Sequence, residues 1–360
     1  MRIAAFTIAL LFLPSICAAQ TFRGMLELKL GGKQIEGMPI SWNPARVHML
    51  GRDGRLWSFK PREASDYRIV SDRFRSYSPS ELRALLLRQL GSRFDVSGTT
   101  HYMIAHPKGE RIQWAERFEK LYRSFVRYFS VRGFQLETPE FLLIGVVCHD
   151  QMEFIQYTAK NSGFADPNVL GYYAIKSNRI TLFDAGSGRS NSNYGRMNAD
   201  TIIHEATHQM AFNTGIHSRY FPAPLWVVEG LATMFEAKGV HDSHSFTQRS
   251  DRINRGRFEY FRKHVIPNSS PELLADTIAS DESFRTNPAA AYACAWALTF
   301  YLVETQPRKY ADYLSRTVDH RPFTKYTTLE RVSDFTEVFG DDWRMLEAQL
   351  IRFAKQLRLD

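Results

Sequence analysis

The sequence His-Glu-Ala-Thr-His at residues 204–208 constrains the fold most, because two histidines four residues apart act together only when they share one face of a helix. The composition predicts roughly 0.02 occurrences of this pattern by chance. Apolar residues recur at spacings of three and four through Met210, which is helical periodicity. Asn198 or Asp200 provides an N-cap. We therefore expect a helix that begins near these two residues and presents both imidazoles on one side.

The imidazoles of His204 and His208 can bind one metal ion, and zinc is the usual ion for this pattern. A catalytic zinc site needs a third protein ligand and an open position. Glu229 lies within the apolar run Trp-Val-Val-Glu-Gly-Leu-Ala, which follows Pro222 and Pro224 and predicts a second helix. A buried carboxylate requires a partner, and a cation supplies one. Glu229 is therefore the expected third ligand, with an arginine or backbone amides as its alternative partners.

Three segments of the chain together resemble a known family. They are HEATHQ at 204–209, the run from Pro224 to Glu236, and Tyr-Ala-Cys-Ala-Trp-Ala-Leu at 292–298. They look like the gluzincin metallopeptidases and, more closely, like the peptidase-MA-like proteins grouped as the DUF1570 domain of unknown function. The resemblance covers about residues 100–310. It implies a zincin-like fold with Zn²⁺ bound by His204, His208 and Glu229.

The resemblance also implies a mechanism. In such enzymes zinc polarises the scissile carbonyl and lowers the pKa of a bound water. Glu205 would be the general base that takes the proton of this water and passes it to the leaving amine. Relatives use a Tyr or His beyond the glutamate helix to stabilise the oxyanion. Tyr292 is therefore the first candidate, with Tyr220 and His217 as alternatives, although Tyr292 also fits the role of a core tyrosine.

One position departs from the pattern of the family. Some gluzincins carry a carboxylate four residues after the glutamate ligand, where it orients a zinc-bound histidine, but this chain has Thr233 there. A ligating histidine usually needs such an acceptor. Glu236, further along the same predicted helix, is a candidate, and the sequence leaves the choice open.

The composition is that of an ordinary globular protein, with 44% hydrophobic and 23% charged residues. The net charge of +8 is a modest surplus, and the chain has no zinc-finger or basic-aromatic pattern, so we expect no nucleic-acid binding. A basic cluster near helical spacing is either a solvated face or a contact with an anionic envelope polymer. This cluster consists of Arg252, Arg255, Arg257, Arg262 and Lys263. The sequence does not indicate the oligomeric state.

Residues 1–19 have the three regions of a secretory signal peptide, with cleavage expected after Ala19. The apolar run at 3–13 is shorter than the about 20 residues that span a bilayer, so we expect no transmembrane segment after cleavage. The mature chain would be periplasmic or secreted, and a chain that stays anchored is the alternative. In an oxidising compartment Cys148 and Cys294 either pair or remain separate buried thiols.

We expect an α+β fold with two domains after the signal peptide. Period-two alternation and glycine turns predict a small antiparallel β module at 20–70, with three or four strands. Residues 71–360 are expected to form a zincin-like domain, a small mixed sheet plus helices. By analogy with zincins, the predicted strand at 179–183 lies at the edge of the sheet, where an extended peptide can pair with it.

These features predict an exported zinc-dependent metallopeptidase that acts on a peptide or protein substrate. The alternative is a catalytically weak or silent zinc-binding envelope assembly or binding protein on a peptidase-like scaffold. A third option is a zinc hydrolase that acts on a non-peptide amide. The intact Glu205 favours an enzyme, because a zinc-binding scaffold has no need of a base at that position.

Overall fold

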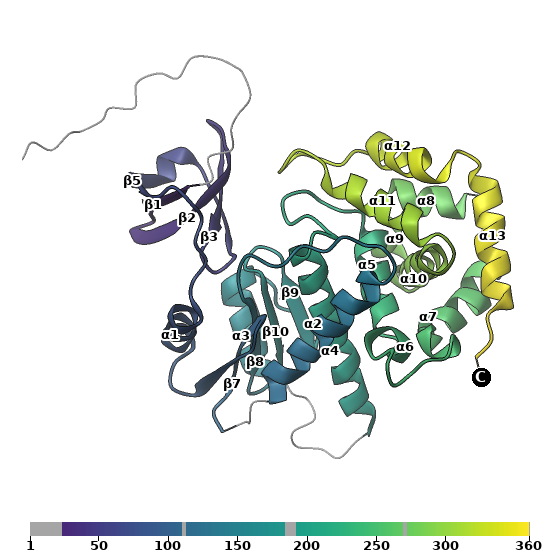
Figure 1. The fold of residues 1–360 in the computed structure, drawn as a ribbon, viewed down its shortest axis with the longest axis horizontal. Coiled ribbons are helices and arrows are strands. Elements are labelled where there is room, and N and C mark those ends of the chain that lie inside the picture. Colours follow the sequence, from purple (N-terminus) through teal and green to yellow (C-terminus); the bar gives the residue numbers. More distant parts are fainter. Residues whose placement is uncertain (1–23, 110–112, 184–191, 269–271, 360) are drawn as a thin grey trace, which may run out of the picture. The chain divides into compact units, whose positions relative to one another are not determined.

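The computed structural model describes residues 24–109, 113–183, 192–268 and 272–359, so the predicted export segment at 1–19 lies outside the described residues. The chain forms two compact units. The first contains residues 24–50 and Ser58–Arg75, and the second contains Gly51–Trp57 and everything from Ser76 onward. Figure 1 follows the chain from the purple N-terminal sheet to the yellow C-terminal helices.

The N-terminal unit is a five-stranded sheet in the order β4-β3-β2-β1-β5. Strand β1 pairs antiparallel with both β2 and β5. The β1–β2 turn uses Gly31 and Gly32, whose positive φ angles of 55° and 77° suit glycine, as the sequence predicted. The prediction of three or four strands missed β5, because most of its side chains are exposed and give no apolar alternation. The strands are β1 (Met25–Leu30), β2 (Lys33–Trp42), β3 (Val47–Gly51), β4 (Leu56–Phe59) and β5 (Ala64–Ser71).

The second unit contains a mixed five-stranded sheet in the order β6-β7-β8-β10-β9. Strand β8 is parallel to β7 and β10, whereas β6 and β9 are antiparallel to their neighbours. With the N-terminal antiparallel sheet and the helices that follow, this confirms the predicted α+β class. The strands are β6 (Phe94–Gly98), β7 (Tyr102–Pro107), β8 (Leu143–Cys148), β9 (Gly171–Ala174) and β10 (Arg179–Phe183).

Alternating side chains of this sheet enter two different apolar clusters, because successive strand residues point to opposite faces. Ile144 and Val146 join a cluster with α1 (Pro79–Leu90) and α3 (Gln151–Ser162). Leu143 and Val147 join a larger cluster with α2 (Gln113–Ser130) and α4 (Ser192–Asn213). Helices therefore cover both faces of the sheet. Helix α4 begins at Ser192, six residues before the predicted cap at Asn198, and α3 was not predicted because its apolar face is narrow.

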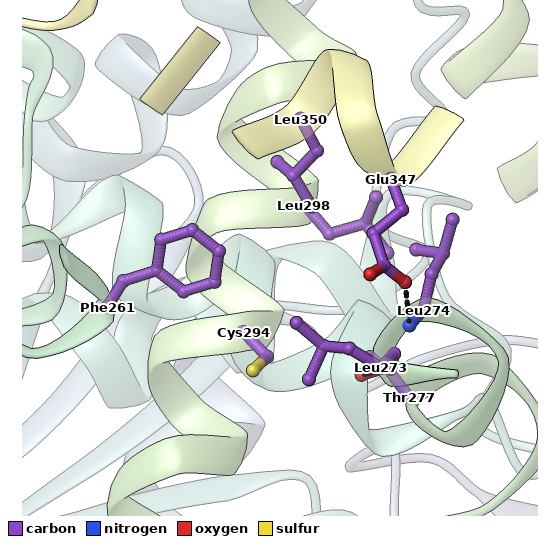
Figure 2. Close-up of a pocket in the computed structure, with 8 residues that line it drawn as sticks. All are labelled: Phe261, Leu273, Leu274, Thr277, Cys294, Leu298, Glu347 and Leu350. Carbon is purple, nitrogen blue, oxygen red and sulfur yellow. Dashed lines mark hydrogen bonds between the residues drawn. The ribbon is translucent and has the colours of Figure 1, made fainter. Parts of the chain in front are cut away.

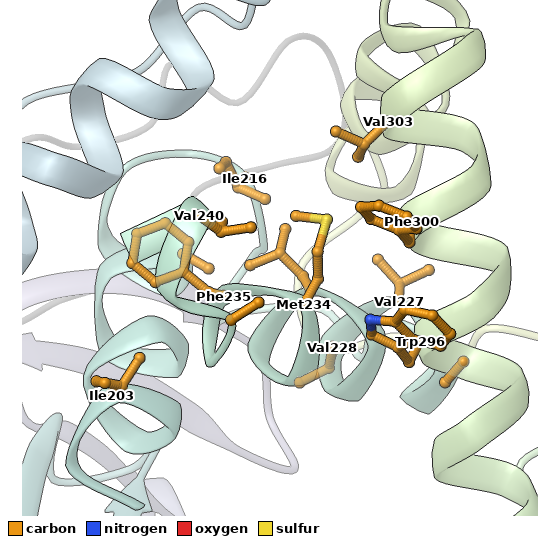
Figure 3. Close-up of a cluster of buried hydrophobic side chains, with 14 of the residues drawn as sticks. Ile203, Ile216, Val227, Val228, Met234, Phe235, Val240, Trp296, Phe300 and Val303 are labelled. Carbon is orange, nitrogen blue, oxygen red and sulfur yellow. The ribbon is translucent and has the colours of Figure 1, made fainter. Parts of the chain in front are cut away.

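The C-terminal half of the second unit is helical, and helices α5 and α10 pack tightly at its centre (Figure 3). Val227 and Met234 of α5 face Trp296 and Phe300 of α10 in the same cluster. Gly230 permits this approach, since a Cβ there would lie 2.5 Å from the carbonyl oxygen of Ala295. The α-helices are α5 (Leu225–Phe235), α6 (Lys238–His241), α7 (Arg255–Tyr260), α8 (Leu273–Ala279), α9 (Ser283–Thr286), α10 (Pro288–Thr305), α11 (Pro307–Val318), α12 (Thr328–Phe339) and α13 (Trp343–Gln356).

Four shorter helical segments complete the described elements. Phe261–Val265 is a π-helical continuation of α7, and the other three are 3₁₀ turns. They are Pro61–Glu63, Ser250–Arg252 and Ile266–Asn268. Within the described residues, no helix is long and apolar enough to cross a membrane.

The two cysteines of the expected mature chain are separate thiols rather than a disulfide. Cys148 lies on β8 and Cys294 on α10, and both are free and buried. Burial raises the pKa of the Cys294 thiol to about 12. Cys294 borders a cavity of about 10 Å³ between Phe261, α8, α10 and α13 (Figure 2), which has room for about one water molecule and not for a larger ligand.

The turn Gly51–Trp57 is packed into the second unit and braces the hairpin between β9 and β10. The buried guanidinium of Arg179 donates to Asp53 at 3.1 Å. Arg219 donates to the carbonyl oxygen of Gly54 at 2.6 Å, and the Leu56 amide donates to the carbonyl of Lys176 at 2.7 Å. These bonds fix the β9–β10 turn, and strand β9 then runs beside helix α4.

Candidate metal centre

Helices α4 and α5 bring the three predicted metal ligands together. His204 and His208 are one helical turn apart on α4, and their rings meet edge to face with centroids 4.6 Å apart. Their Nε2 atoms are 3.0 Å apart. Glu229 projects from α5 and places Oε2 3.2 Å from Nε2 of His204 and 3.7 Å from Nε2 of His208. The sequence therefore predicted a cluster that the fold assembles from two helices.

The three ligand atoms fit a zinc ion. Tetrahedral bonds of about 2.0–2.2 Å place neighbouring ligand atoms about 3.3–3.6 Å apart. The observed separations of 3.0, 3.2 and 3.7 Å bracket that value. Two imidazoles and one carboxylate are also a donor set that zinc favours. Among the described residues, no other group of three His, Cys, Asp or Glu side chains converges in this way. His241 and His244 therefore form no second cluster of this kind.

The charges of the cluster suit a cation. Burial alone would raise the pKa of Glu229, but His208, His204 and the Tyr292 hydroxyl lower it to about 2. Burial lowers the pKa of His208 to about 4, which leaves its imidazole neutral at pH 7. Burial also disfavours a charged His204, but hydrogen bonds to Glu229 and Glu236 raise its pKa above the usual value. A bound cation would release that proton.

Glu205 lies beside the cluster and is oriented by strand β9. Its Oε2 accepts a hydrogen bond of 2.6 Å from the backbone amide of Tyr173. Burial raises the pKa of Glu205 to about 7, although the charge of His204 and the Tyr173 amide partly offset this effect. Gly171 allows helix α4 to approach the strand, since a Cβ there would lie 2.9 Å from Cγ2 of Thr201. Glu205 is thus a carboxylate with a raised pKa, held by strand β9 beside the three candidate ligands.

The edge strand next to this carboxylate is β9, not the strand that the sequence predicted. Strand β10 (Arg179–Phe183) lies between β8 and β9, so both of its sides are paired. Within the described residues, β9 (Gly171–Ala174) is the last strand of the sheet. The analogy took β10 as the edge strand because β10 is the last strand before α4 in the chain. In the structure, β9 pairs antiparallel with the outer side of β10 and so forms the edge itself.

Glu236 is the acceptor that orients His204. Its Oε1 receives a hydrogen bond of 2.8 Å from Nδ1 of His204, and its Oε2 accepts one of 2.7 Å from Nδ2 of Asn254. Thr233, the residue at the position used by some gluzincins, instead donates to the backbone carbonyl of Glu229 at 2.6 Å. The sequence offered Glu236 as one option. It gave no sign of Asn254, whose role depends on the tertiary packing of α7.

Tyr292, the first candidate for the oxyanion donor, lies beside the candidate ligand Glu229. It is half-buried on α10, and its hydroxyl lies close enough to Glu229 for each group to shift the pKa of the other. Burial and the Glu229 charge raise its pKa, so the hydroxyl stays protonated and able to donate. Of the two alternatives, His217 is buried, and burial together with the charge of His208 lowers its pKa to about 3. The charged groups that affect the pKa of Tyr220 are Arg219, Glu140 and Glu137, and none of them belongs to the cluster.

The centre differs from common zinc sites at His208. Its Nδ1 atom is buried and has no hydrogen-bond partner among the described residues. Metal-bound histidines usually donate from the second nitrogen to an acceptor. His204, which Glu236 holds, is therefore the better oriented of the two imidazoles.

Comparison with known proteins gives a partial answer on ancestry. Residues 198–324 match a family described as "Protein of unknown function (DUF1570)". This match agrees with the predicted resemblance to that family, and it includes the HEATH sequence, Glu229 and Tyr292. No curated protein matches the chain. The gluzincin relationship remains a prediction.

Among solved structures, the chain is similar to a variant M1 zinc metallopeptidase from Deinococcus radiodurans, crystallised with a Tyr-Ser-Ala substrate. The two sequences are 15% identical and the TM-score is 0.38. The similarity covers 70% of this chain and 47% of the other, so this chain matches less than half of that enzyme's length.

Proposed function

We propose that this protein is a zinc-dependent peptidase. The observation that carries the proposal is the convergence of Nε2 of His204, Nε2 of His208 and Oε2 of Glu229 within 3.7 Å. The partly buried Glu205, whose pKa burial raises to about 7, lies beside them. The three residues would hold the zinc ion, and Glu236 would fix the orientation of His204. An ion-binding scaffold without catalysis would not require Glu205 at this position.

In the proposed reaction, Glu205 and Tyr292 have separate roles. When bound, zinc supplies Lewis-acid polarisation of a peptide carbonyl and lowers the pKa of water. Glu205, whose Oε2 accepts from the Tyr173 amide, would take the proton of the attacking water on its other carboxylate oxygen, Oε1, and deliver it to the leaving amine nitrogen. The Tyr292 hydroxyl would donate a hydrogen bond to the developing oxyanion.

A paired measurement tests the proposal. Zinc per chain and hydrolysis of a peptide library are measured for the wild type, Glu205→Gln and His204→Ala. We expect one zinc per chain in the wild type and in Glu205→Gln. We expect a loss of activity of at least about 100-fold in Glu205→Gln, since general-base catalysis typically contributes 10²–10⁴-fold. His204→Ala should lose the zinc.

The control is His241→Ala, a half-buried histidine outside the cluster, which should retain both zinc and activity. Hydrolysis that survives Glu205→Gln would refute the assigned base. Unchanged zinc content in His204→Ala would refute the metal centre. A wild type that binds zinc and cleaves nothing would favour the silent envelope scaffold over the enzyme.

We also propose that the protein is exported and is cleaved after Ala19, which would place the peptidase in the periplasm or outside the cell. The support is the sequence of residues 1–19 alone. N-terminal sequencing of the protein recovered from its native host distinguishes a chain that begins at Gln20 from an anchored, uncleaved chain.

A further inference from the structure

The structure separates the members of the basic cluster that the sequence singled out. Arg252 forms a two-pronged ion pair with Glu304, with bonds of 3.1 and 2.9 Å. Lys263 lies 3.4 Å from Glu259 on the same helical surface. Arg257 differs from both, because its guanidinium lies over the ring of Tyr292, 4.9 Å from the ring centroid. The cluster is therefore not one uniform solvated face.

Arg257 borders the candidate metal centre, since helix α7 contacts that centre at two points. Its N-cap, Asn254, donates to Glu236, which in turn accepts from His204. One turn later, Arg257 lies over the ring of Tyr292, whose hydroxyl is close enough to Glu229 for each to shift the pKa of the other. The guanidinium thus lies against the ring of a residue that neighbours the candidate ligand Glu229.

The charge of Arg257 has no acidic partner in the part of the chain that the structure describes. Its backbone amide donates to Oδ1 of Asn254, but its side chain forms no ion pair there. The nearby carboxylate of Glu236 is already bonded to His204 and Asn254. Arg257 is therefore a half-buried cation that lies over a ring beside the candidate metal centre and forms no ion pair with the described residues, which suits it to bind an anion.

We propose that Arg257 binds a carboxylate of the substrate, so that this peptidase acts on peptides that present a carboxylate close to the scissile bond. The proposal rests on the proposed function and names its substrate class. A guanidinium binds a carboxylate through two parallel N–H···O bonds. Contact with the Tyr292 ring restricts the orientation of the Arg257 guanidinium and so pre-organises this bidentate binding. The carboxylate comes either from the C-terminus of a peptide or from an Asp or Glu side chain.

A binding experiment tests this without relying on catalysis. The probes are alkyl hydroxamates that end in a carboxylate, with spacers of increasing length, and their methyl esters. Calorimetry on the zinc-loaded chain measures the dissociation constant of each probe. The wild type should bind the best carboxylate probe at least about tenfold more tightly than its ester, as expected for a charge-assisted hydrogen-bonded pair.

Arg257→Gln should abolish this preference. Arg257→Lys should retain part of it, because the positive charge remains while the bidentate hydrogen bonding of the guanidinium is lost. The matched control is Arg262→Gln, since Arg262 stacks on Phe258 of the same helical segment, with 5.3 Å to the centroid, but lies away from Tyr292. Unchanged zinc content shows that each variant keeps the centre. A wild type without preference, or a preference that survives Arg257→Gln, overturns the proposal.

Peptide assays then separate the two sources of the carboxylate. If the C-terminus is recognised, amidation of the peptide lowers kcat/KM by about tenfold or more, and a Glu-to-Gln change inside the peptide has no such effect. If a side chain is recognised, the two results are reversed. A chain that hydrolyses no peptide but shows the Arg257-dependent preference for the carboxylate probe refutes the peptidase and keeps the anion site.

Discussion

At the scale of single residues, the orientation of His204 depends on one carboxylate. Glu236 accepts from Nδ1 of His204 at 2.8 Å, and Asn254 holds the other oxygen of that carboxylate. We predict that Glu236→Gln weakens zinc affinity about 10–100-fold, the usual effect of losing such a partner. Competition with a chromophoric chelator measures the affinity. Glu259→Gln, an exposed pair with Lys263, is the control, and equal affinities in the two variants would contradict the prediction.

The residues that the sequence predicted are those whose chemistry is local. His204 and His208 are linked by helical periodicity, and Glu229 is marked by its apolar neighbours. Asn254 and the Tyr173 amide were not predictable, because each reaches the centre through packing between elements distant in the chain. Arg257 was predicted only as part of a basic cluster, and its contact with Tyr292 distinguishes it from the others.

At the scale of elements, the position of Glu229 depends on how closely helix α5 approaches α10. A Cβ on Gly230 would lie 2.3 Å from Oγ1 of Thr299 and 2.5 Å from the carbonyl oxygen of Ala295. We predict that Gly230→Ala lowers the free energy of unfolding by about 1–3 kcal/mol, because overpacking forces the helices apart. Denaturant unfolding measures this change.

Gly256→Ala is the matched control for that prediction. Gly256 lies in helix α7, and a Cβ added there would have its nearest neighbour 3.8 Å away, which is an ordinary contact. This substitution should be neutral or should stabilise by up to about 1 kcal/mol, because alanine favours a helix. If both variants unfold at the same denaturant concentration, the close approach of α5 and α10 does not limit stability.

The elements that the sequence located are those with strong periodicity or clear caps. Helix α1 has its N-cap at Ser78 and its C-cap at Gly91, and serine and glycine are residue types that favour these positions. The order of strands in the sheet was harder to predict from the sequence. Strands β9 and β10 are both short and mostly apolar, and only their tertiary pairing shows which one is the edge. The peptide-pairing hypothesis therefore moves from Arg179–Phe183 to Gly171–Ala174.

At the scale of the whole molecule, composition indicated a globular chain but not how its parts divide. The contacts assign Gly51–Trp57 to the second unit, although this turn joins two strands of the N-terminal sheet. Hydrogen bonds from Arg179 to Asp53 and from Arg219 to the carbonyl oxygen of Gly54 hold the turn in the second unit. No local pattern in the turn predicts these long-range partners, and the turn itself was predicted correctly from its glycines.

Zinc should stabilise the second unit, because a ligand that binds only the folded state adds its binding free energy to stability. At a free zinc concentration of 100 times Kd this gain is about 2.7 kcal/mol. We predict that zinc raises the Tm of the wild type and not that of His204→Ala, as measured by calorimetry at pH 8. The His241→Ala variant, with its histidine outside the cluster, should respond as the wild type does.

The same shift in Tm should shrink as the pH falls. Burial disfavours a charged His204, but its bonds to Glu229 and Glu236 dominate and raise its pKa. In the zinc-free chain the protonated His204 therefore adds stability at low pH, and that contribution is lost as the pH rises through the raised pKa. Zinc must displace this proton, so acid favours the zinc-free form and alkali favours the zinc-bound form. A zinc-induced shift that is as large at pH 5.5 as at pH 8 would mean that zinc binds through groups other than the two histidines.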